Sequence, residues 1–410
     1  MPENRGETFE SAGPYRGPDP IADECSSPMT GDSADAVVVG GGVVGCSIAY
    51  HLARRGAAVV VLERETIGSQ STGRCAGGVR QQFSSPANVL VQQLSFRLLA
   101  QLESETGVDP EFRHIGYLFV LTDESEISDF RRFLPMWHHN GVSDARWLEP
   151  REVRELAPLV QGEDILGGTF CPSDGIASPH AVTIAYAGAA RRLGMTFREG
   201  VAVEGIVREG ARVRAVRTSE GQIKTPAVFN CAGAWAGAVG QMAGIHVPVE
   251  PYPRNIFVTD PMPGVSRQHP MTIDFATSFY FHPEGDGLLF GMGMPDEKPS
   301  FSTDVDWGVL DVMAEVVDRR APLLATAGIQ AAWAGLYEVT PDHQPILGPV
   351  DDLDGFWCAC GFSGHGFQQA PAVGCLLAQW FSGERPEVPL DIFAHRRFAT
   401  GNVEPERNVV

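Results

Sequence analysis

The segment Ala36-Val37-Val38-Val39-Gly40-Gly41-Gly42-Val43-Val44-Gly45 decides the fold. Its apolar run is typical of a strand buried on both faces of a parallel sheet. The glycines form a G-x-G-x-x-G pattern, and residues 46–55 continue with helical spacing as far as Gly56. Residues 57–63 are a second apolar run, so the stretch predicts a complete β-α-β unit of the type that binds dinucleotides.

Each glycine of this pattern has a separate task. Gly40 permits the tight turn, Gly42 lets a pyrophosphate approach the backbone, and Gly45 lets the helix pack close to the sheet. Glu63 ends the second predicted strand, where a carboxylate accepts hydrogen bonds from ribose hydroxyls and repels a 2′-phosphate. The pattern therefore favours FAD or NAD over NADP.

A second glycine-rich segment, Gly361-Phe-Ser-Gly-His-Gly-Phe367, lies near the other end of the chain, before a predicted helix. The N-terminus of that helix would stabilise negative charge, such as that on the pyrimidine ring of a reduced flavin. The alternative is a plain strand–helix connection. The sequence contains no second G-x-G-x-x-G, which a flavoprotein with a separate NAD domain would normally show.

Composition excludes several classes of protein. The chain has 410 residues, which suggests two or three domains, with 43% hydrophobic and 20% charged residues as in an ordinary globular protein. Its net charge of −20 argues against binding to nucleic acid or to an anionic membrane. No apolar run approaches the ~18 residues that a spanning helix needs. The first residues do not resemble a secretory signal, so we expect a cytoplasmic protein.

Neither cysteine nor histidine spacing predicts a metal or a disulfide framework. The eight cysteines are too sparse for such a framework and are expected to be buried free thiols. His138 and His139 are adjacent and would point in different directions on a helix. We therefore expect no metal.

The remaining periodicity predicts further helices and strands. We expect helices at 90–106, 180–194, 306–320 and 370–382, and two helices within 125–160 that are separated by a turn at Asn140-Gly141. The expected strands lie at 196–198, 201–207, 211–218, 222–224, 226–233 and 356–360, with alternating strands over 247–339.

This order predicts an α/β fold, in which a Rossmann-like FAD-binding domain carries an inserted β-rich α+β substrate domain. The FAD-binding domain would comprise 35–108, 176–247 and 341–398, and the substrate domain 109–175 and 248–340. Residues 1–34 are rich in Pro, Gly, Ser and acidic residues and are expected to be a disordered tail. Residues 399–410 are expected to be a second tail.

Four ordered motifs resemble the D-amino-acid oxidase family of FAD-dependent oxidoreductases. They are Val37–Gly45 with Glu63, Ser71–Arg80, Asn230–Trp235, and Thr340–Gly348 with Gly361–Phe367. Within the family, they look most like the branch of glycine oxidase, sarcosine oxidase and the proline dehydrogenase β-subunit. The resemblance runs from about residue 35 to about residue 398.

The resemblance implies FAD bound in an extended conformation. The cysteine that carries covalent flavin in monomeric sarcosine oxidase falls at Gly335, so we expect noncovalent FAD. The residues implied in FAD binding are Gly40, Gly42, Val43, Val44, Gly45, Glu63, Arg64, Ser71, Thr72, Gly77, Gly78, Val203, Cys231, Ala232, Gly233, Trp235, Gly361, Ser363, Gly364, His365, Gly366, Phe367 and Gln368.

The resemblance also implies the chemistry. The family removes hydride from a carbon that bears an amine, passes it to flavin N5, and releases an imine that hydrolyses to an aldehyde or keto acid plus an amine. Arg80 matches a carboxylate-binding arginine, although a loop arginine at the surface is the alternative. Tyr280 and Tyr337 match pocket aromatics, or are plain core residues. His365 completes the implied catalytic set.

Three departures from the family pattern leave alternatives open. A lysine that the sarcosine oxidase branch uses with oxygen falls at about Leu289, the lysine after the glycine-rich loop is Gln368, and the arginine of glycine oxidase falls around Tyr337–Glu338. We therefore expect a secondary amine or N-substituted amino acid longer than glycine, with O2 or another electron acceptor.

Two alternative functions stay open. One is the flavin subunit of a multi-subunit amine or proline dehydrogenase. The other is a 2-hydroxy-acid oxidoreductase with His282 or His365 as its base. The sequence is compatible with a homo- or hetero-oligomer.

Overall fold

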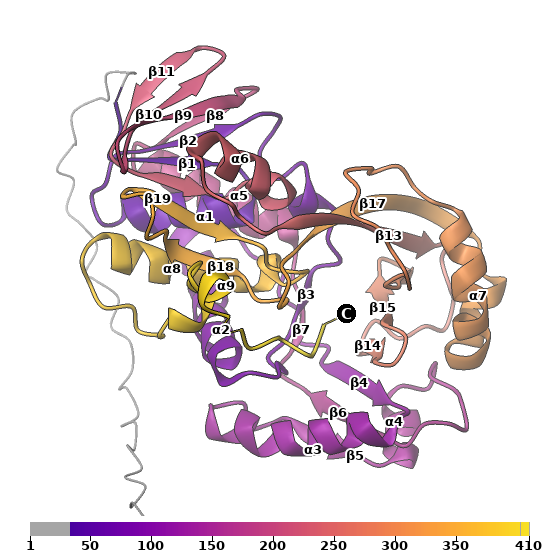
Figure 1. Cartoon of the computed structure of the whole chain (residues 1–410). Helices are drawn as coiled ribbons and strands as arrows, with labels where there is room; N and C mark the ends of the chain where they lie inside the picture. Colours follow the sequence, from indigo (N-terminus) through magenta and orange to yellow (C-terminus); the bar gives the residue numbers. More distant parts are fainter. Residues whose placement is uncertain (1–32, 402, 410) are drawn as a thin grey trace, which may run out of the picture.

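The computed structural model describes residues 33–401 and 403–409, which contain two large sheets (Figure 1). The six-stranded sheet has the order β18-β19-β12-β1-β2-β8. All its neighbours pair in parallel except β18 and β19. Its strands are β1 (Ala36–Val39), β2 (Val59–Glu63), β8 (Thr196–Glu199), β12 (Val228–Asn230), β18 (Ile346–Pro349) and β19 (Phe356–Cys360).

The central strand β1 is buried on both faces, because each face of the sheet is covered by other elements. Ala36 and Val38 face a core built from four packed helices: α1 (Val43–Ala53), α2 (Pro86–Thr106), α5 (Pro179–Arg192) and α8 (Gly366–Phe381). Val37 and Val39 face α6 (Ala236–Ala243) and a three-stranded sheet of β9 (Val203–Glu209), β10 (Arg212–Thr218) and β11 (Gly221–Lys224). The predicted β-α-β unit is thereby confirmed.

The second sheet has eight strands in the order β17-β13-β16-β15-β14-β4-β6-β5. The parallel pair β14–β4 joins two stretches that are far apart in the chain. The strands are β4 (Tyr117–Leu121), β5 (Arg146–Leu148), β6 (Gly167–Cys171), β13 (Glu250–Thr259), β14 (Met271–Asp274), β15 (Phe279–Glu284), β16 (Gly287–Gly291) and β17 (Ile329–Val339).

Helices cover both faces of this sheet. On one face, α4 (Pro150–Leu156) and α7 (Gly308–Arg320) pack against Phe257, Phe279 and Phe281. On the other face, α3 (Glu124–His139) packs its aromatic residues on β4 and on the neighbouring strands. A two-stranded sheet of β3 (Gly78–Val79) and β7 (Gly175–Ile176) lies near the junction of the two large sheets (Figure 1).

The expected helices are found with shifted ends. The largest shifts, of four residues, are at the starts of α2 and α8, which begin at Pro86 and Gly366 instead of at residues 90 and 370. The interpretation of 125–160 as two helices omitted one element. The turn at Asn140-Gly141 is present, but β5 lies between α3 and α4 because Arg146–Leu148 pairs with β6.

The strands of the six-stranded sheet all fall within 35–108, 176–247 and 341–398, and those of the eight-stranded sheet within 109–175 and 248–340. The division into two domains stays a prediction. The tail predicted at 1–34 lies outside the described residues, apart from Ser33 and Ala34. Ala34 donates its backbone N–H to Lys224 at 3.0 Å.

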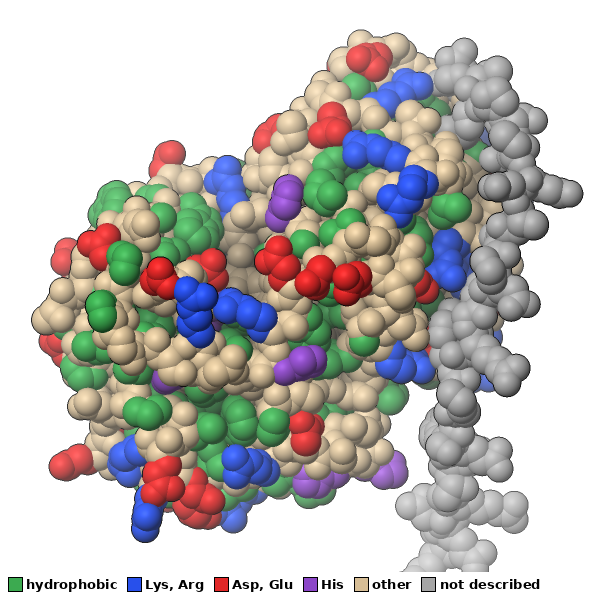
Figure 2. All heavy atoms as spheres, turned by 180° about the vertical axis from the view of Figure 1, so that it is seen from behind, with side chains coloured by type: hydrophobic (Ala, Val, Ile, Leu, Met, Phe, Trp, Pro, Cys, Tyr) green, Lys and Arg blue, Asp and Glu red, His purple; other side chains and the backbone are tan. Residues whose placement is uncertain are grey.

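Charge is mixed over the face shown in Figure 2, where acidic and basic side chains are interspersed with scattered hydrophobic ones. Over residues 33–401 and 403–409, no helix is long and apolar enough to cross a membrane. The same residues contain no group of three or more His, Cys, Asp or Glu side chains arranged to hold a metal ion.

The C-terminal segment differs from the predicted tail. Glu406 and Asn408 are almost fully buried. The Glu406 carboxylate accepts hydrogen bonds from the backbone N–H of Ser84 at 2.7 Å and from the side-chain amide of Asn88 at 2.8 Å. These polar partners hold residues 403–409 against the body of the protein, although the segment is poor in apolar residues.

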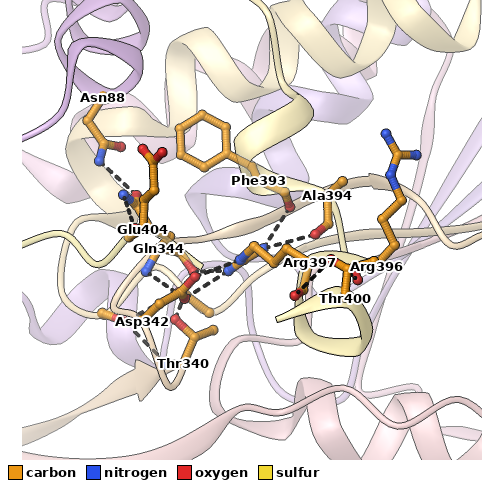
Figure 3. A network of polar contacts seen from close by, with 12 residues as sticks. Asn88, Thr340, Asp342, Gln344, Phe393, Ala394, Arg396, Arg397, Thr400 and Glu404 are labelled. Atoms are coloured by element: carbon orange, nitrogen blue, oxygen red, sulfur yellow. Dashed lines mark hydrogen bonds and ion pairs between the residues drawn. The ribbon is translucent and has the colours of Figure 1, made fainter. Parts of the chain in front are cut away.

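A buried ion pair anchors this end of the chain (Figure 3). Arg397 donates from Nε and Nη2 to the two carboxylate oxygens of Asp342, at 2.7 and 3.0 Å, and both side chains are 3% exposed. Arg397 also donates to the backbone carbonyl of Gln344, whose side-chain amide donates to the carbonyl of Glu404. The turn before β18 is therefore bound to the C-terminal segment.

Replacing Arg397 by methionine should lower the free energy of unfolding by about 3–5 kcal/mol, because Asp342 would be left as an unpaired buried carboxylate. The neighbouring Arg396 is 56% exposed and offers a matched control. Arg396→Met should cost less than about 1 kcal/mol. Chemical denaturation of both variants tests this prediction, and equal losses would contradict it.

Candidate functional site

A cavity runs from the glycine turn after β1 to the face of the eight-stranded sheet. The space that the centre of a water molecule can occupy in it is about 380 Å³. Its walls include the end of β2, the segment 68–80, the turn after β12, and the loop before α8. These elements come from distant parts of the chain. The cavity therefore brings together all four motifs that the sequence analysis selected.

Gly40 and Gly45 shape the turn by their lack of side chains. Gly40 has φ +110°, and a Cβ on it would overlap the carbonyl oxygen of Cys231. A Cβ on Gly45 would overlap the carbonyl oxygen of Gly40. The ends of β1 and β12 and the start of α1 are consequently in close contact, and the N-terminus of α1 opens onto the cavity.

The start of α1 fits a phosphate group. The N-cap residue is Gly42, which has no side chain and presents bare backbone to the cavity. Within the described part of the chain, the N–H of Val43 donates to the hydroxyl of Thr72, at 3.1 Å. Helix N–H groups and the positive end of the helix dipole both favour an anion there. The residues present therefore fit the pyrophosphate of a dinucleotide such as FAD.

Glu63 and Trp235 mark the nucleoside end of the cavity. One Glu63 carboxylate oxygen accepts the N–H of Gly41 at 2.7 Å, which holds the carboxylate at the cavity wall. The Arg64 guanidinium lies 3.7 Å from the centre of the Trp235 ring, and Val203 lines the wall beside them. A carboxylate, a flat cation and an aromatic ring suit a ribose and a purine.

The loop before α8 forms the opposite wall. Its Gly364 lies directly against the Tyr337 ring, since a Cβ on this glycine would overlap the ring. Gln368 accepts the backbone N–H of Arg80 at 2.8 Å through its side-chain oxygen. Gln368, in the first turn of α8, therefore binds the segment 77–80, and the loop before α8 contacts Tyr337 of the eight-stranded sheet.

Arg80 is buried, with 2% of its surface exposed, and its guanidinium already has acceptors. It donates to the carbonyl of Gln82 at 2.7 Å, to His365 Nε2 at 2.9 Å, and to the carbonyl of Asn408. Burial lowers the pKa of Arg80 below its ordinary value. These three acceptors bind Nη1 and Nη2 of Arg80, and its predicted role in binding a substrate carboxylate stays a prediction.

His365 Nε2 accepts from Arg80, so its ring is neutral and carries its proton on Nδ1. Burial, and next the Arg80 charge, hold the pKa of His365 well below its ordinary range. His282 lies off the cavity wall, and its ring nitrogens are 3.0 and 3.1 Å from the carbonyls of Pro283 and Ala76. Burial lowers the pKa of His282 as well.

Tyr280 and Tyr337 both line the cavity where it meets the eight-stranded sheet. Burial raises the pKa of both phenols, which keeps them protonated at neutral pH. Sequence analysis missed Arg254 on β13, whose guanidinium lies 4.7 Å from the centre of the Tyr337 ring. The strand register places Arg254 opposite Gly335, two residues from Tyr337, and only the fold brings these positions together.

Most residues predicted to bind FAD or substrate line this one cavity. The exceptions are Gly45, Gly361 and Ser363, which shape neighbouring backbone instead. The lining residues that were predicted are Gly40, Gly42, Val43, Val44, Glu63, Arg64, Ser71, Thr72, Gly77, Gly78, Arg80, Val203, Cys231, Ala232, Gly233, Trp235, Tyr280, Tyr337, Gly364, His365, Gly366, Phe367 and Gln368.

Glu338 is a lining residue that sequence analysis did not assign to the site. As the neighbour of Tyr337 on β17, it points to the opposite side of the strand, toward Gly233. Its Oε2 atom is buried and has no hydrogen-bond partner among residues 33–401 and 403–409. Burial raises the pKa of this carboxyl to about 7.

Glu338 should therefore make the cofactor-free protein less stable as pH rises. In the unfolded chain the carboxyl ionises near its ordinary value of 4.5, whereas in the folded protein it stays protonated up to about 7. The folded state binds the extra proton between these values, so stability falls across that window at about 1.4 kcal/mol per pH unit.

The variant Glu338→Gln removes this titration. Its stability relative to the unmodified protein should increase by up to about 3 kcal/mol between pH 4.5 and 7 and then stay constant. Thermal and chemical unfolding across this range measures the difference. The exposed Glu315→Gln serves as a control and should show no such increase. If the difference in stability between Glu338→Gln and the unmodified protein does not change with pH, the raised pKa of Glu338 is contradicted.

Comparison with known proteins agrees with this geometry. The family model described as FAD dependent oxidoreductase matches residues 35–380. Human mitochondrial sarcosine dehydrogenase is 33% identical over 96% of this chain and 45% of its own length. The 4-methylaminobutanoate oxidase (formaldehyde-forming) of Paenarthrobacter nicotinovorans is 28% identical over 85% of this chain and 44% of its own length. The chain thus spans less than half the length of these curated relatives.

Solved structures share the fold over nearly their whole length. The L-proline dehydrogenase of P. horikoshii superposes with a TM-score of 0.85, at 34% identity, over 91% of this chain and 100% of that chain. The glycine oxidase of Geobacillus kaustophilus gives 0.78, at 26% identity, over 88% and 98%. With its glycine turn, open helix N-terminus and continuous cavity, this chain belongs to the family of FAD-dependent oxidoreductases.

Proposed function

We propose that the protein oxidises the C–N bond of a secondary amine or N-substituted amino acid with FAD. The observation that carries this proposal is the continuous cavity, which links a dinucleotide cradle to a wall of protonated tyrosines and an arginine. Relatives that act on sarcosine, dimethylglycine and 4-methylaminobutanoate support the substrate class. When bound, FAD would accept the hydride that leaves the substrate carbon.

The chain's own residues would bind and enclose the reactants. The α1 N-terminus would hold the pyrophosphate, and Glu63 would hold the ribose. Tyr280 and Tyr337 would exclude water from the reacting carbon and donate hydrogen bonds through their protonated hydroxyls. The imine that results would hydrolyse to an aldehyde or keto acid plus an amine.

The protonation states and positions of the residues at the site favour an amine substrate over a 2-hydroxy-acid substrate. An alcohol needs an enzymic base, whereas a neutral amine supplies its own lone pair. The lone pair of His365 Nε2 is engaged by Arg80, and His282 lies off the cavity wall. Glu338 lies on the other side of β17 from Tyr337. None of these groups is a free base beside the tyrosines.

The electron acceptor is a separate question. Leu289 on β16 is 3% exposed. By the resemblance described above, the lysine of the sarcosine oxidase branch falls at about this position. We propose that a cation at this position is missing and that reaction with oxygen is consequently slow. A dehydrogenase that passes electrons to a partner is the second candidate function.

Anaerobic mixing of the FAD-loaded protein with secondary amines, N-methyl amino acids, amino acids and 2-hydroxy acids tests the proposal. We expect the oxidised flavin absorbance to disappear with an amine and to stay unchanged with hydroxy acids. On readmission of air, slow recovery would support the dehydrogenase, and fast recovery would identify an oxidase. Bleaching by a 2-hydroxy acid alone, or by none of the compounds, would overturn the proposed amine oxidation.

A further inference from the structure

Four arginines line the cavity, and each has partners within the chain. Arg64 stacks on Trp235. Arg74 donates to the carbonyl of Ala334 at 2.9 Å, and Arg80 is held by Gln82, His365 and Asn408. The fourth, Arg254, differs because one of its buried donor atoms has no hydrogen-bond partner in the described part of the chain.

Arg254 has a donor that lacks an acceptor. Its Nη1 atom donates to the carbonyl of Pro253 at 2.8 Å and forms an ion pair with Glu297. Its Nε atom is buried and has no hydrogen-bond partner within the described part of the chain. Leaving a buried donor unpaired is costly, and more so for a charged group, so the chain's own acceptors do not fully satisfy the Arg254 guanidinium.

The surroundings of Arg254 fit a small organic anion. Arg254 lies on the same face of the sheet as Ile256, which also lines the cavity. The Tyr337 ring packs beneath the guanidinium, and the Tyr280 hydroxyl lies over Gly291, the cross-strand partner of Ile256. A guanidinium that stacks on an aromatic ring can bind a carboxylate through its N–H groups, while nearby aromatic rings contact the apolar part of the ligand.

Glu297 holds the guanidinium in this position. It belongs to the connection between β16 and α7 and reaches Arg254 from outside the sheet; the side chains are 16% and 19% exposed, respectively. Burial raises the pKa of Glu297, and the Arg254 charge lowers it. The ion pair uses Nη1 and leaves Nε without a partner in the described part of the chain.

We propose that the guanidinium of Arg254 binds the carboxylate of the substrate, and that Glu297 positions this guanidinium. This assignment rests on the proposed amine oxidation and narrows its substrates to amines that carry a carboxylate. Arg80 then has a structural role, since it binds the loop before α8 and the C-terminal segment to segment 77–80.

Binding of pyrrole-2-carboxylate to the FAD-loaded protein tests the proposal without turnover. This probe is a planar secondary amine with a carboxylate and no oxidisable sp³ carbon. Its binding should be followed by perturbation of the oxidised flavin spectrum and by calorimetry. Arg254→Gln should raise the dissociation constant about 10- to 100-fold, the loss expected for one charge-assisted contact.

Controls separate charge from geometry. Arg254→Lys keeps the charge but lacks the planar guanidinium, so it should recover only part of the affinity. Arg267→Gln removes an exposed arginine that pairs with Asp286, and it should leave affinity unchanged. Affinity for uncharged pyrrole should be the same in all variants, and the flavin content of each should be equal.

Three outcomes would overturn the assignment. Unchanged affinity in Arg254→Gln would exclude Arg254 as the carboxylate partner. A larger loss in Arg80→Gln than in Arg254→Gln, with equal flavin content, would assign the carboxylate to Arg80. Loss of FAD from Arg254→Gln would assign Arg254 to the cofactor.

The proposed function can fail separately. If the proposed function is wrong but Arg254 binds the carboxylate, amines leave the flavin oxidised, and Arg254→Gln still weakens binding of pyrrole-2-carboxylate. Conversely, amine oxidation with no effect of Arg254→Gln on binding or on KM for carboxylate substrates would overturn only this inference.

Discussion

The contact between the ends of β1 and β12 and the start of α1 is the constraint on which the rest of the structure depends. Three backbone segments meet where Gly40 and Gly45 leave no room for a side chain. This contact aligns the N–H groups of α1 with the cavity and places Cys231 beside the turn. Any larger residue at Gly40 or Gly45 would separate the helix from the sheet and remove the anion-binding end.

Local charge at the site has the opposite sign to the net charge of the protein. The chain carries a net charge of −20, yet four arginines and the start of α1 face a cavity that also contains Glu63 and Glu338. Buried charges are weakly screened, so the nearest groups determine which ligand binds. An acidic surface is thus compatible with a pyrophosphate and a carboxylate as neighbouring ligands.

Sequence predicted those parts of the site that depend on short-range patterns. The β-α-β unit and the glycine-rich loop are continuous motifs whose residue types have few alternative explanations. Arg254 could not be found in this way, because its significance depends on the register between β13 and β17 and on a buried donor, Nε, that has no partner in the described part of the chain. Burial of Glu406 and Asn408 was also unpredictable, because it depends on polar partners more than 300 residues away in the sequence.

The path of the chain has a consequence for how the protein folds. The chain crosses from one large sheet to the other four times, after β2, β6, β12 and β17. During synthesis, β1 stays without its partner β12, β2 without β8 and β4 without β14 until those later strands have been made. Such long-range pairing slows folding and keeps unpaired strand edges exposed in the meantime. The two sheets should therefore form in one cooperative step, late in synthesis, and not one after the other.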